Sequence, residues 1–247
     1  MTRNHCYTAL ILRSRASGEA NRDVWLLTNE AGLFRATVFG GPKSRLRSYA
    51  SPFNSGQAFI YQDPVKDTRK ISDFDVRSWR PGLRELYERA MAADAIAETI
   101  LATHGGGGNW GRALALAEAV LDALDCADSE TCSRLLLYFL WHWAEFLGIR
   151  PDFDRCSLCG KPALPGSVLW YSPAEGGMVC GDCCDDGQET RLMDAGPGCR
   201  RWLETVRLLP PAQLVRYTLD GTSLRQAKAL AAAILAEAFG RRLTTFL

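Results

Sequence analysis

The chain has 247 residues, of which 47% are apolar and 23% are charged, and its formal net charge is +1. This composition is ordinary for a soluble globular protein with one large domain or two small ones. The longest apolar run, residues 135–141, is far shorter than the roughly twenty residues that a membrane-spanning helix needs, which excludes a helical membrane protein.

No segment near the N-terminus has the pattern of a targeting signal. Residues 1–6 are polar, and the apolar run that follows, residues 7–12, is too short for the core of a signal peptide. We therefore expect a cytosolic protein. In that compartment the nine cysteines are better explained by a metal site and buried thiols than by disulfides.

Charge is distributed unevenly along the chain. Residues 1–80 carry 13 lysines and arginines against 7 acids, a net of +6, whereas residues 81–155 carry 6 against 12, a net of −6. This asymmetry predicts two modules, of which the first faces an anionic partner. A charged surface that is only solvated is the alternative interpretation.

The first eighty residues alternate apolar and polar side chains and are rich in β-branched and aromatic types, which predicts strands. Five short strands in about seventy residues favour a small closed barrel, so we expect an OB-fold, with an SH3-like barrel as the alternative. The predicted strands lie near residues 6–13, 24–29, 33–39, 57–62 and 71–78.

The connection after the third predicted strand is rich in glycine and in cations. It carries three cations at alternate positions with no acid nearby, which predicts a flexible loop that contacts phosphates. Single-stranded nucleic acid is bound by a basic groove with aromatic faces on which bases stack. The predicted DNA-binding cations are Arg13, Arg15, Arg35, Lys43, Arg45 and Arg47. The candidate stacking rings, most of which we expect in the barrel core, are Phe34, Phe39, Tyr49, Phe53 and Tyr61.

The chain from residue 81 onward is predicted to be mainly helical. Four glycines at 105–108 break the first helix, and because no Lys-Ser or Lys-Thr follows them they indicate a surface linker. The third helix is apolar almost all round, which is typical of a helix buried in the centre of a bundle. Ser223 and Gln226 form a plausible capping box before the last helix. The predicted helices span residues 81–103, 110–124, 131–147, 198–209 and 224–243.

Two polar residues, His142 and Glu145, stand three positions apart on the third predicted helix. A metal-binding or acid–base role is one interpretation. A core histidine with a hydrogen-bond partner is the interpretation that we favour.

Two C-x-x-C pairs, Cys156 with Cys159 and Cys180 with Cys183, are separated by twenty residues. This spacing is typical of a zinc site, because tetrahedral Zn²⁺ prefers thiolate ligands and the turn-rich linker brings the second pair back to the first. Four cysteine ligands leave no open position, so we predict one structural zinc per chain. Disulfides or unrelated thiols are the alternatives, and Cys184 competes with Cys183 as the fourth ligand.

Two segments have a distinctive pattern. The zinc segment reads G-x-x-P-x-x-x-x-C-x-x-C-G over residues 148–160 and G-G-x-x-C-x-x-C over residues 176–183. The basic loop reads K-S-R-L over residues 43–46, with Pro52-Phe53 a few residues later. In these segments the chain resembles the RecO family of bacterial recombination-repair mediators. The likeness covers nearly the whole chain and is specific in these two places.

The resemblance implies an α+β protein: an OB-fold barrel over residues 1–80 that binds nucleic acid, and a helical domain over 81–247 with an inserted zinc ribbon at about 152–190. It implies a nucleoid-associated, non-enzymatic protein that binds single- and double-stranded DNA and anneals complementary strands. It also implies that the protein acts with RecR to load RecA onto DNA coated by single-strand-binding protein.

A further implication is that single-strand-binding protein is bound through its acidic, apolar C-terminal tail. Such a tail needs a hydrophobic groove beside one cation. Arg134 and Tyr138 lie one turn apart on the most apolar helix, so we predict that Arg134 takes the tail carboxylate and that Tyr138 forms part of the groove wall. The alternative is that Arg134 pairs with Glu130 or Asp128.

Two other classes of protein compete with this interpretation. One is a zinc-dependent nucleic-acid enzyme, but the sequence contains no H-E-x-x-H, G-x-S-x-G or phosphate-loop motif, so we expect no enzymatic activity. The other is a zinc-ribbon interaction scaffold with no direct role on DNA. The +6 charge of residues 1–80 argues against the scaffold.

Overall fold

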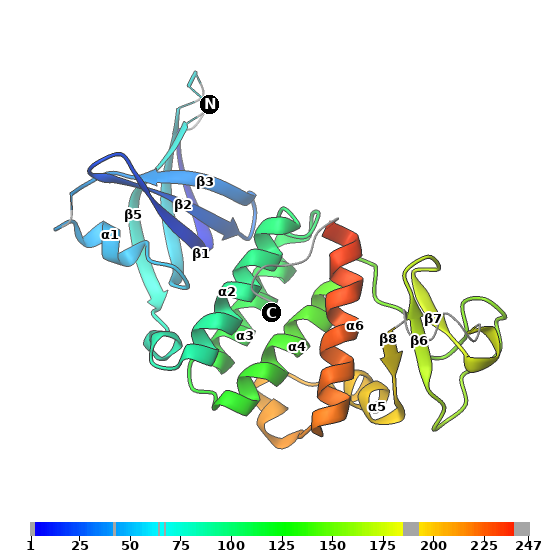
Figure 1. Ribbon diagram of the computed structural model, residues 1–247. Helices are drawn as coiled ribbons and strands as arrows, with labels where there is room; N and C mark the ends of the chain where they lie inside the picture. Colours follow the sequence, from blue (N-terminus) through cyan, green and yellow to red (C-terminus); the bar gives the residue numbers. More distant parts are fainter. Residues whose placement is uncertain (1–2, 42, 64, 67, 185–192, 240–247) are drawn as a thin grey trace. The chain divides into compact units, whose positions relative to one another are not determined.

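The fold was analysed in a computed structural model (Figure 1). It describes residues 3–41, 43–63, 65–66, 68–184 and 193–239. The chain divides into two compact units, residues 1–126 and 127–247, which we describe one at a time. The boundary between the units follows residue 126, whereas the sequence placed a domain boundary at residue 80. The first two long helices belong to the same unit as the barrel.

The first unit contains a closed five-stranded barrel with the strand order β1-β2-β3-β5-β4. Strand β1 pairs with both β2 and β4, and a short parallel pairing of β3 with β5 closes the barrel. The order and the closure confirm the predicted OB-fold barrel. The strands are β1 (Asn4–Ser17), β2 (Asn21–Thr28), β3 (Gly32–Val38), β4 (Ser55–Asp63) and β5 (Thr68–Ser78).

Alternation along the strands builds the barrel core. Val24 and Leu26 on β2, and Phe34 and Ala36 on β3, point inward and are buried. The side chains between them point outward, as the two-residue period of a strand requires. The register of β1 against β2 shifts between Ile11 and Arg13, which marks a bulge.

The connection after β3 is not wholly a flexible loop, which corrects the prediction. Residues Arg45–Tyr49 form a short helix, α1, that begins after Ser44. Leu46 and Tyr49 pack against the barrel core, and this apolar contact holds the segment in a helical turn. The cations of the segment are therefore carried by a packed helix and the turn before it.

The same unit continues with η1 (Pro81–Arg84), α2 (Tyr87–Ala102) and α3 (Trp110–Leu124). The predicted break at residues 105–108 is confirmed, and all four glycines there have positive φ. A Cβ atom at Gly105 would lie 3.3 Å from the side chains of Leu27 and Leu33, so this linker runs directly over the outer face of β2 and β3. One part of that face is thus covered by the helical segment.

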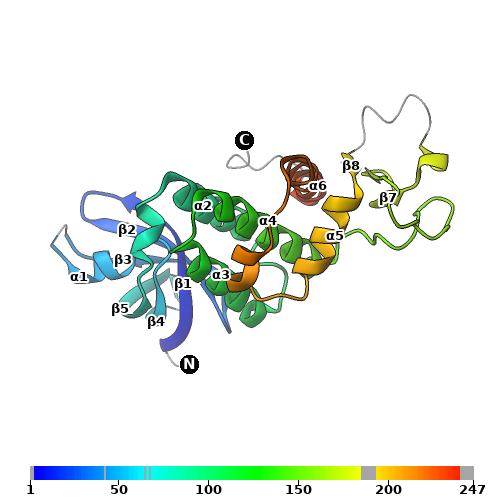
Figure 2. The same ribbon diagram turned by 90° about the horizontal axis from the view of Figure 1, so that it is seen from below.

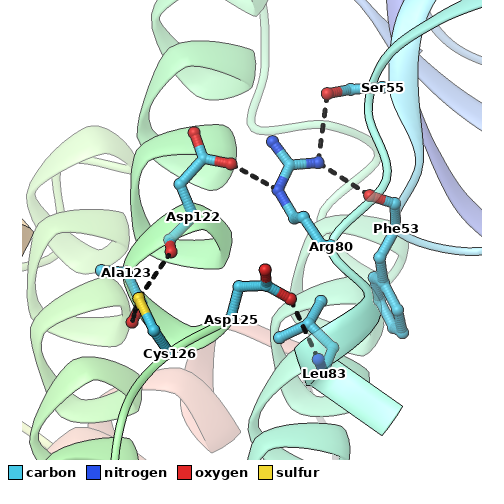
Figure 3. A network of polar contacts seen from close by, with 8 residues as sticks. All are labelled: Phe53, Ser55, Arg80, Leu83, Asp122, Ala123, Asp125 and Cys126. Atoms are coloured by element: carbon cyan, nitrogen blue, oxygen red, sulfur yellow. Dashed lines mark hydrogen bonds and ion pairs between the residues drawn. The ribbon is translucent and has the colours of Figure 1, made fainter.

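Arg80 joins the barrel to α3 through a buried guanidinium group (Figure 3). Its Nε donates to Asp122 at 2.6 Å, and its Nη1 donates to the Phe53 carbonyl at 2.7 Å and to Ser55 Oγ at 3.1 Å. Both Phe53 and Arg80 have left-handed backbone conformations, with φ of +70° and +44°. The hydrogen bonds offset the cost of these conformations.

The second unit is centred on α4 (Ser129–Phe146). Its buried residues lie on nearly every side of the helix, as predicted for the centre of a bundle. Around it lie α5 (Pro197–Val206), η4 (Pro211–Arg216) and α6 (Gly221–Phe239). The predicted end of the last helix, at residue 243, is outside the described residues.

The capping box predicted for the last helix is wrong. The carboxylate of Asp220 accepts the backbone N–H groups of Thr222 and Ser223, both at 3.0 Å, and so satisfies the start of α6. Gln226 instead donates to Asp194 at 2.5 Å and accepts from the Gly196 N–H at 3.3 Å. It therefore joins α6 to the segment before α5.

A small three-stranded sheet with the order β7-β6-β8 lies between α4 and α5 in the sequence. Its strands are β6 (Leu169–Ser172), β7 (Gly177–Val179) and β8 (Met193–Ala195). Strand β8, which the sequence did not predict, pairs with β6 and lies beside α6 (Figure 2). The sheet carries the cysteine motif.

We predict that the Arg80 contacts set the stability of the first unit. Arg80→Ala should lower the free energy of unfolding by about 3 kcal/mol, because buried acceptors lose a charged donor. Arg80→Gly should cost about 1 kcal/mol less than Arg80→Ala, because glycine adopts positive φ without strain. Denaturant unfolding of the full chain measures both.

Arg84→Ala is the matched control. Its guanidinium also donates to a carbonyl of the barrel segment, Pro52 O at 3.2 Å, but this hydrogen bond is exposed to solvent. The control should lose less than about 1 kcal/mol. Equal losses in Arg80→Ala and Arg84→Ala would contradict the assigned role of Arg80.

Candidate functional site

Three of the predicted cations gather around one tryptophan on the outer face of the barrel. Trp25 on β2 pairs with Arg13 on β1 and with Arg35 on β3, so the three side chains form one row across the strands. The guanidinium carbon of Arg15 lies 5.9 Å from the centre of the Trp25 ring. We call this group of Arg13, Arg15, Trp25 and Arg35 the Trp25 face.

The Trp25 face remains accessible and positively charged. Arg15 and Arg35 are exposed, and Arg13 and Trp25 are partly exposed. Two acids face these cations. Asp23 lies 3.7 Å from Arg35 and accepts a hydrogen bond from Thr37 at 2.8 Å, and Asp94 on α2 is close enough to Arg13 for their charges to interact. Because Asp23 is largely covered while Arg35 is 64% exposed, this pairing leaves the guanidinium available to other anions.

The second group of predicted cations lies on and before α1. Lys43 and Arg45 are exposed and Arg47 is partly exposed. Among the described residues, no side-chain hydrogen bond, ion pair or ring contact joins these three cations to the Trp25 face. The six predicted cations therefore form two groups on the barrel.

The predicted stacking rings divide into buried and accessible ones. Phe34 belongs to the barrel core, and Tyr49 packs edge-on against Trp79, with ring centres 5.5 Å apart. Tyr61 lies under the ammonium of Lys70 at 4.7 Å. Phe39 is the most accessible of the predicted rings, with 55% of its surface exposed. Trp25 was not predicted, because it lies in the unbroken apolar run of residues 24–27, where no alternation tells the inner face from the outer one.

The four predicted cysteines come together in the small sheet. The sulfurs of Cys156, Cys159, Cys180 and Cys183 all lie within 4.8 Å of one another. Zinc–sulfur bonds of about 2.3 Å in a tetrahedron place neighbouring sulfurs about 3.8 Å apart, and the Cys159 and Cys180 sulfurs are 3.8 Å apart. This cluster can hold a metal ion, and Cys184 is not part of it.

Backbone geometry prepares the cysteine cluster for negative charge. Burial alone would raise the pKa of the Cys156 thiol, but backbone N–H groups of Cys159, Cys180 and Leu158 outweigh it and lower the pKa to about 6. Hydrogen bonding to Cys159 raises the pKa of Cys183 to about 12. The cluster therefore favours one thiolate and disfavours further ones. A bound divalent cation would offset the repulsion between the thiolates and stabilise all of them.

Two glycines shape the turns around the cluster. Gly160 has φ of +69° directly after Cys159, which confirms the turn predicted there. A Cβ atom on Gly177 would collide with the Ser157 side chain, and the Ser157 N–H donates to the Met178 carbonyl at 2.8 Å. The first cysteine pair thus lies directly against β7.

All nine cysteines lie in the described part of the chain, and none of them forms a disulfide there. Of the five cysteines outside the cluster, Cys132, Cys184 and Cys199 are buried as predicted, whereas Cys6 and Cys126 are exposed. None of the described helices is long and apolar enough to cross a lipid bilayer.

The two predicted peptide-binding residues lie inside the second unit. Arg134 is buried, donates to Thr131 Oγ1 at 2.9 Å and lies 3.8 Å from Glu130, which is the alternative pairing foreseen for it. Tyr138 is 5% exposed and donates to the Leu209 carbonyl at 2.8 Å. Their role in binding a carboxylate tail stays a prediction, and it now requires the residues that cover them to move.

His142 occupies the core position that we favoured. Its Nδ1 lies 3.0 Å from the Tyr138 carbonyl oxygen and its Nε2 lies 3.3 Å from the Arg207 carbonyl oxygen. Burial lowers the pKa of His142, which favours the neutral ring. Glu145 pairs with Arg150 at 2.6 Å instead of turning towards the histidine.

The barrel, the cationic aromatic face and the four-cysteine sheet together define a barrel protein with a zinc-ribbon-like insertion. Comparison with known proteins agrees with this class. The family model described as Recombination protein O N terminal matches residues 1–78, and the model described as Recombination protein O C terminal matches residues 84–196. The chain belongs to the RecO family.

Curated relatives support the same assignment along nearly the whole chain. A DNA repair protein RecO from Rubrobacter xylanophilus is 31% identical over 94% of this chain and 91% of the relative. One from Myxococcus xanthus is 30% identical over 95% of this chain and 92% of the relative. Membership of this family supports a role in DNA repair and recombination.

Proposed function

We propose that the chain is a non-enzymatic mediator of recombinational repair that binds DNA through the Trp25 face. The observation that carries this proposal is the row in which Trp25 stands between Arg13 and Arg35, with the Arg15 guanidinium over the ring. A base would stack on the indole as Arg15 moves off the ring to a phosphate, and its flanking phosphates would then lie within reach of the guanidinium groups.

The cations near α1 would also bind DNA. Lys43, Arg45 and Arg47 would contact phosphates of the same strand or of a duplex, without reading its sequence. Binding of both single- and double-stranded DNA is consistent with contacts that depend on charge and on ring faces. Because the substrate is chromosomal DNA, we place the protein in the cytoplasm, at the nucleoid.

The partners are proposed from family membership. We propose that the chain anneals complementary strands, and that with RecR it helps to load RecA onto DNA coated by single-strand-binding protein. The C-terminal tail of that protein is the proposed contact of the second unit. An interaction scaffold without a direct role on DNA remains the competing function, and DNA-binding measurements separate the two.

A salt titration with a labelled single-stranded oligonucleotide tests the DNA-binding proposal. Affinity should fall steeply as salt rises, and Arg13→Ala/Arg15→Ala/Arg35→Ala should reduce the slope by about two, because each phosphate contact contributes roughly 0.7 on a single strand. The corresponding change of Lys43, Arg45 and Arg47 measures the α1 group separately.

Arg77→Ala is the control, since Arg77 is an exposed arginine on β5 outside both groups. It should leave the slope nearly unchanged. An unaltered slope in both triple variants would move the DNA site elsewhere. If the wild-type chain shows no salt-dependent binding, the scaffold function takes the place of this proposal.

We also propose that Cys156, Cys159, Cys180 and Cys183 hold one structural zinc ion. Protein purified without chelator should contain about one zinc per chain, and Cys183→Ser should lose the ion and unfold the small sheet locally, because metal binding and folding are coupled. Cys184→Ser, which changes the neighbouring residue, should retain zinc. Zinc retained in Cys183→Ser but lost in Cys184→Ser would reverse the ligand assignment.

A further inference from the structure

A hollow of about 470 Å³ opens on the barrel between the end of β3, α1 and β5. It is lined by Phe39, Leu46, Lys70, Ile71 and Ser72, and we call it the Phe39 hollow. Its volume falls within the roughly 300–1,000 Å³ that is usual for pockets that bind small ligands. The sequence named Phe39 as a candidate stacking ring, but the hollow around it is visible only in the structure.

The lining combines an apolar ring with polar groups. Phe39 is 55% exposed, and beside it Leu46 and Ile71 belong to the apolar packing of the barrel. Lys70 and Ser72 are exposed and add an ammonium and a hydroxyl group. An exposed phenyl ring beside apolar side chains is unfavourable in water. A flat apolar ligand that covers the ring buries this surface and so gains free energy of binding.

Cations border the hollow on two sides. The segment 31–62, which contains Phe39 and α1, has four cations and no acid. Three of these cations, Lys43, Arg45 and Arg47, lie on or just before α1. On the other side, β5 contributes Lys70, and the exposed acid Asp73 follows directly after Ser72. The cations are thus spread along both borders of the hollow instead of being focused at one point.

We propose that the Phe39 hollow holds one unpaired base of a nucleic-acid strand, stacked on Phe39, while the phosphates on either side of that base contact the cations of α1 and β5. The inference rests on the proposed DNA-binding function and deepens it. A strand carries one negative charge at each nucleotide, which matches cations on both borders. A peptide tail with one terminal carboxylate would need only one cation.

The hollow would add to the preference for unpaired bases that stacking on Trp25 also gives. A base inside a duplex is stacked on both faces and paired along its edge, so it cannot enter a pocket without leaving the helix. Phosphate contacts, in contrast, are available in duplex and single strand alike. The hollow should therefore discriminate in favour of unpaired nucleotides.

The test compares Phe39→Ala with the wild-type full chain on a single-stranded DNA oligonucleotide and on a duplex of the same sequence. Affinity for the single strand should fall about 5- to 150-fold, the range that corresponds to roughly 1–3 kcal/mol for one stacked base. Affinity for the duplex should change less than about twofold. Phe39→Trp, which keeps an aromatic ring at this position, should bind the single strand about as tightly as the wild type.

Phe59→Ala is the matched control, because Phe59 is another exposed phenylalanine of the barrel, 42% exposed on β4, and does not line the hollow. It should leave both affinities unchanged. Thermal unfolding of each variant shows whether the fold is intact.

Three results would overturn the inference. Wild-type single-strand affinity in Phe39→Ala, while the Trp25-face variants are weakened, would reject the hollow and leave the proposed function standing. Equal losses for single strand and duplex would show that Phe39 does not select unpaired bases. Loss of binding to an acidic peptide with an apolar C-terminus, at unchanged DNA affinity, would assign the hollow to a protein partner. Absence of salt-dependent DNA binding in the wild-type chain would instead reject the proposed function itself.

Discussion

The first unit depends on the buried guanidinium group of Arg80. A planar cation with several donors can hold three acceptors at once, here from the segment before β4, the start of β4 and α3. These contacts fix where the chain leaves the barrel after β5 and where the helices begin. The helical segment then covers the part of the outer face near Leu27 and Leu33, and the row that contains Trp25 stays open.

In the second unit, the small sheet needs stabilisation from outside its own strands. Three strands of three or four residues cannot bury enough apolar surface to be stable alone. Two other constraints act there: the convergence of four sulfurs and the attachment of β8 to α6. The Gln226 side chain strengthens that attachment by hydrogen-bonding both Asp194 and Gly196.

Local patterns were enough to predict the strands of the barrel, the long helices and the cysteine cluster, because each depends on short-range periodicity or spacing. Features that depend on pairing between distant segments were missed. The role of Trp25 follows only from the register that sets Arg13 and Arg35 on either side of it. The burial of Arg134 follows from its position on a helix that is buried nearly all round, and its charge alone does not indicate it. Likewise, the cap at Asp220 became visible only from backbone geometry.

The seam between β3 and β5 has a consequence for how the barrel opens. Among the described residues, two residue pairs join these strands, Thr37 with Lys70 and Val38 with Ile71, and the partners are far apart in the sequence. Long loops must close before such a short ladder forms, so we expect the barrel to open first at this seam. Phe39 follows one side of the seam, and Lys70 and Ile71 lie on the other. A ligand bound between them would add its binding free energy to the pairing of the two strands, and the barrel would be harder to open when the ligand is bound.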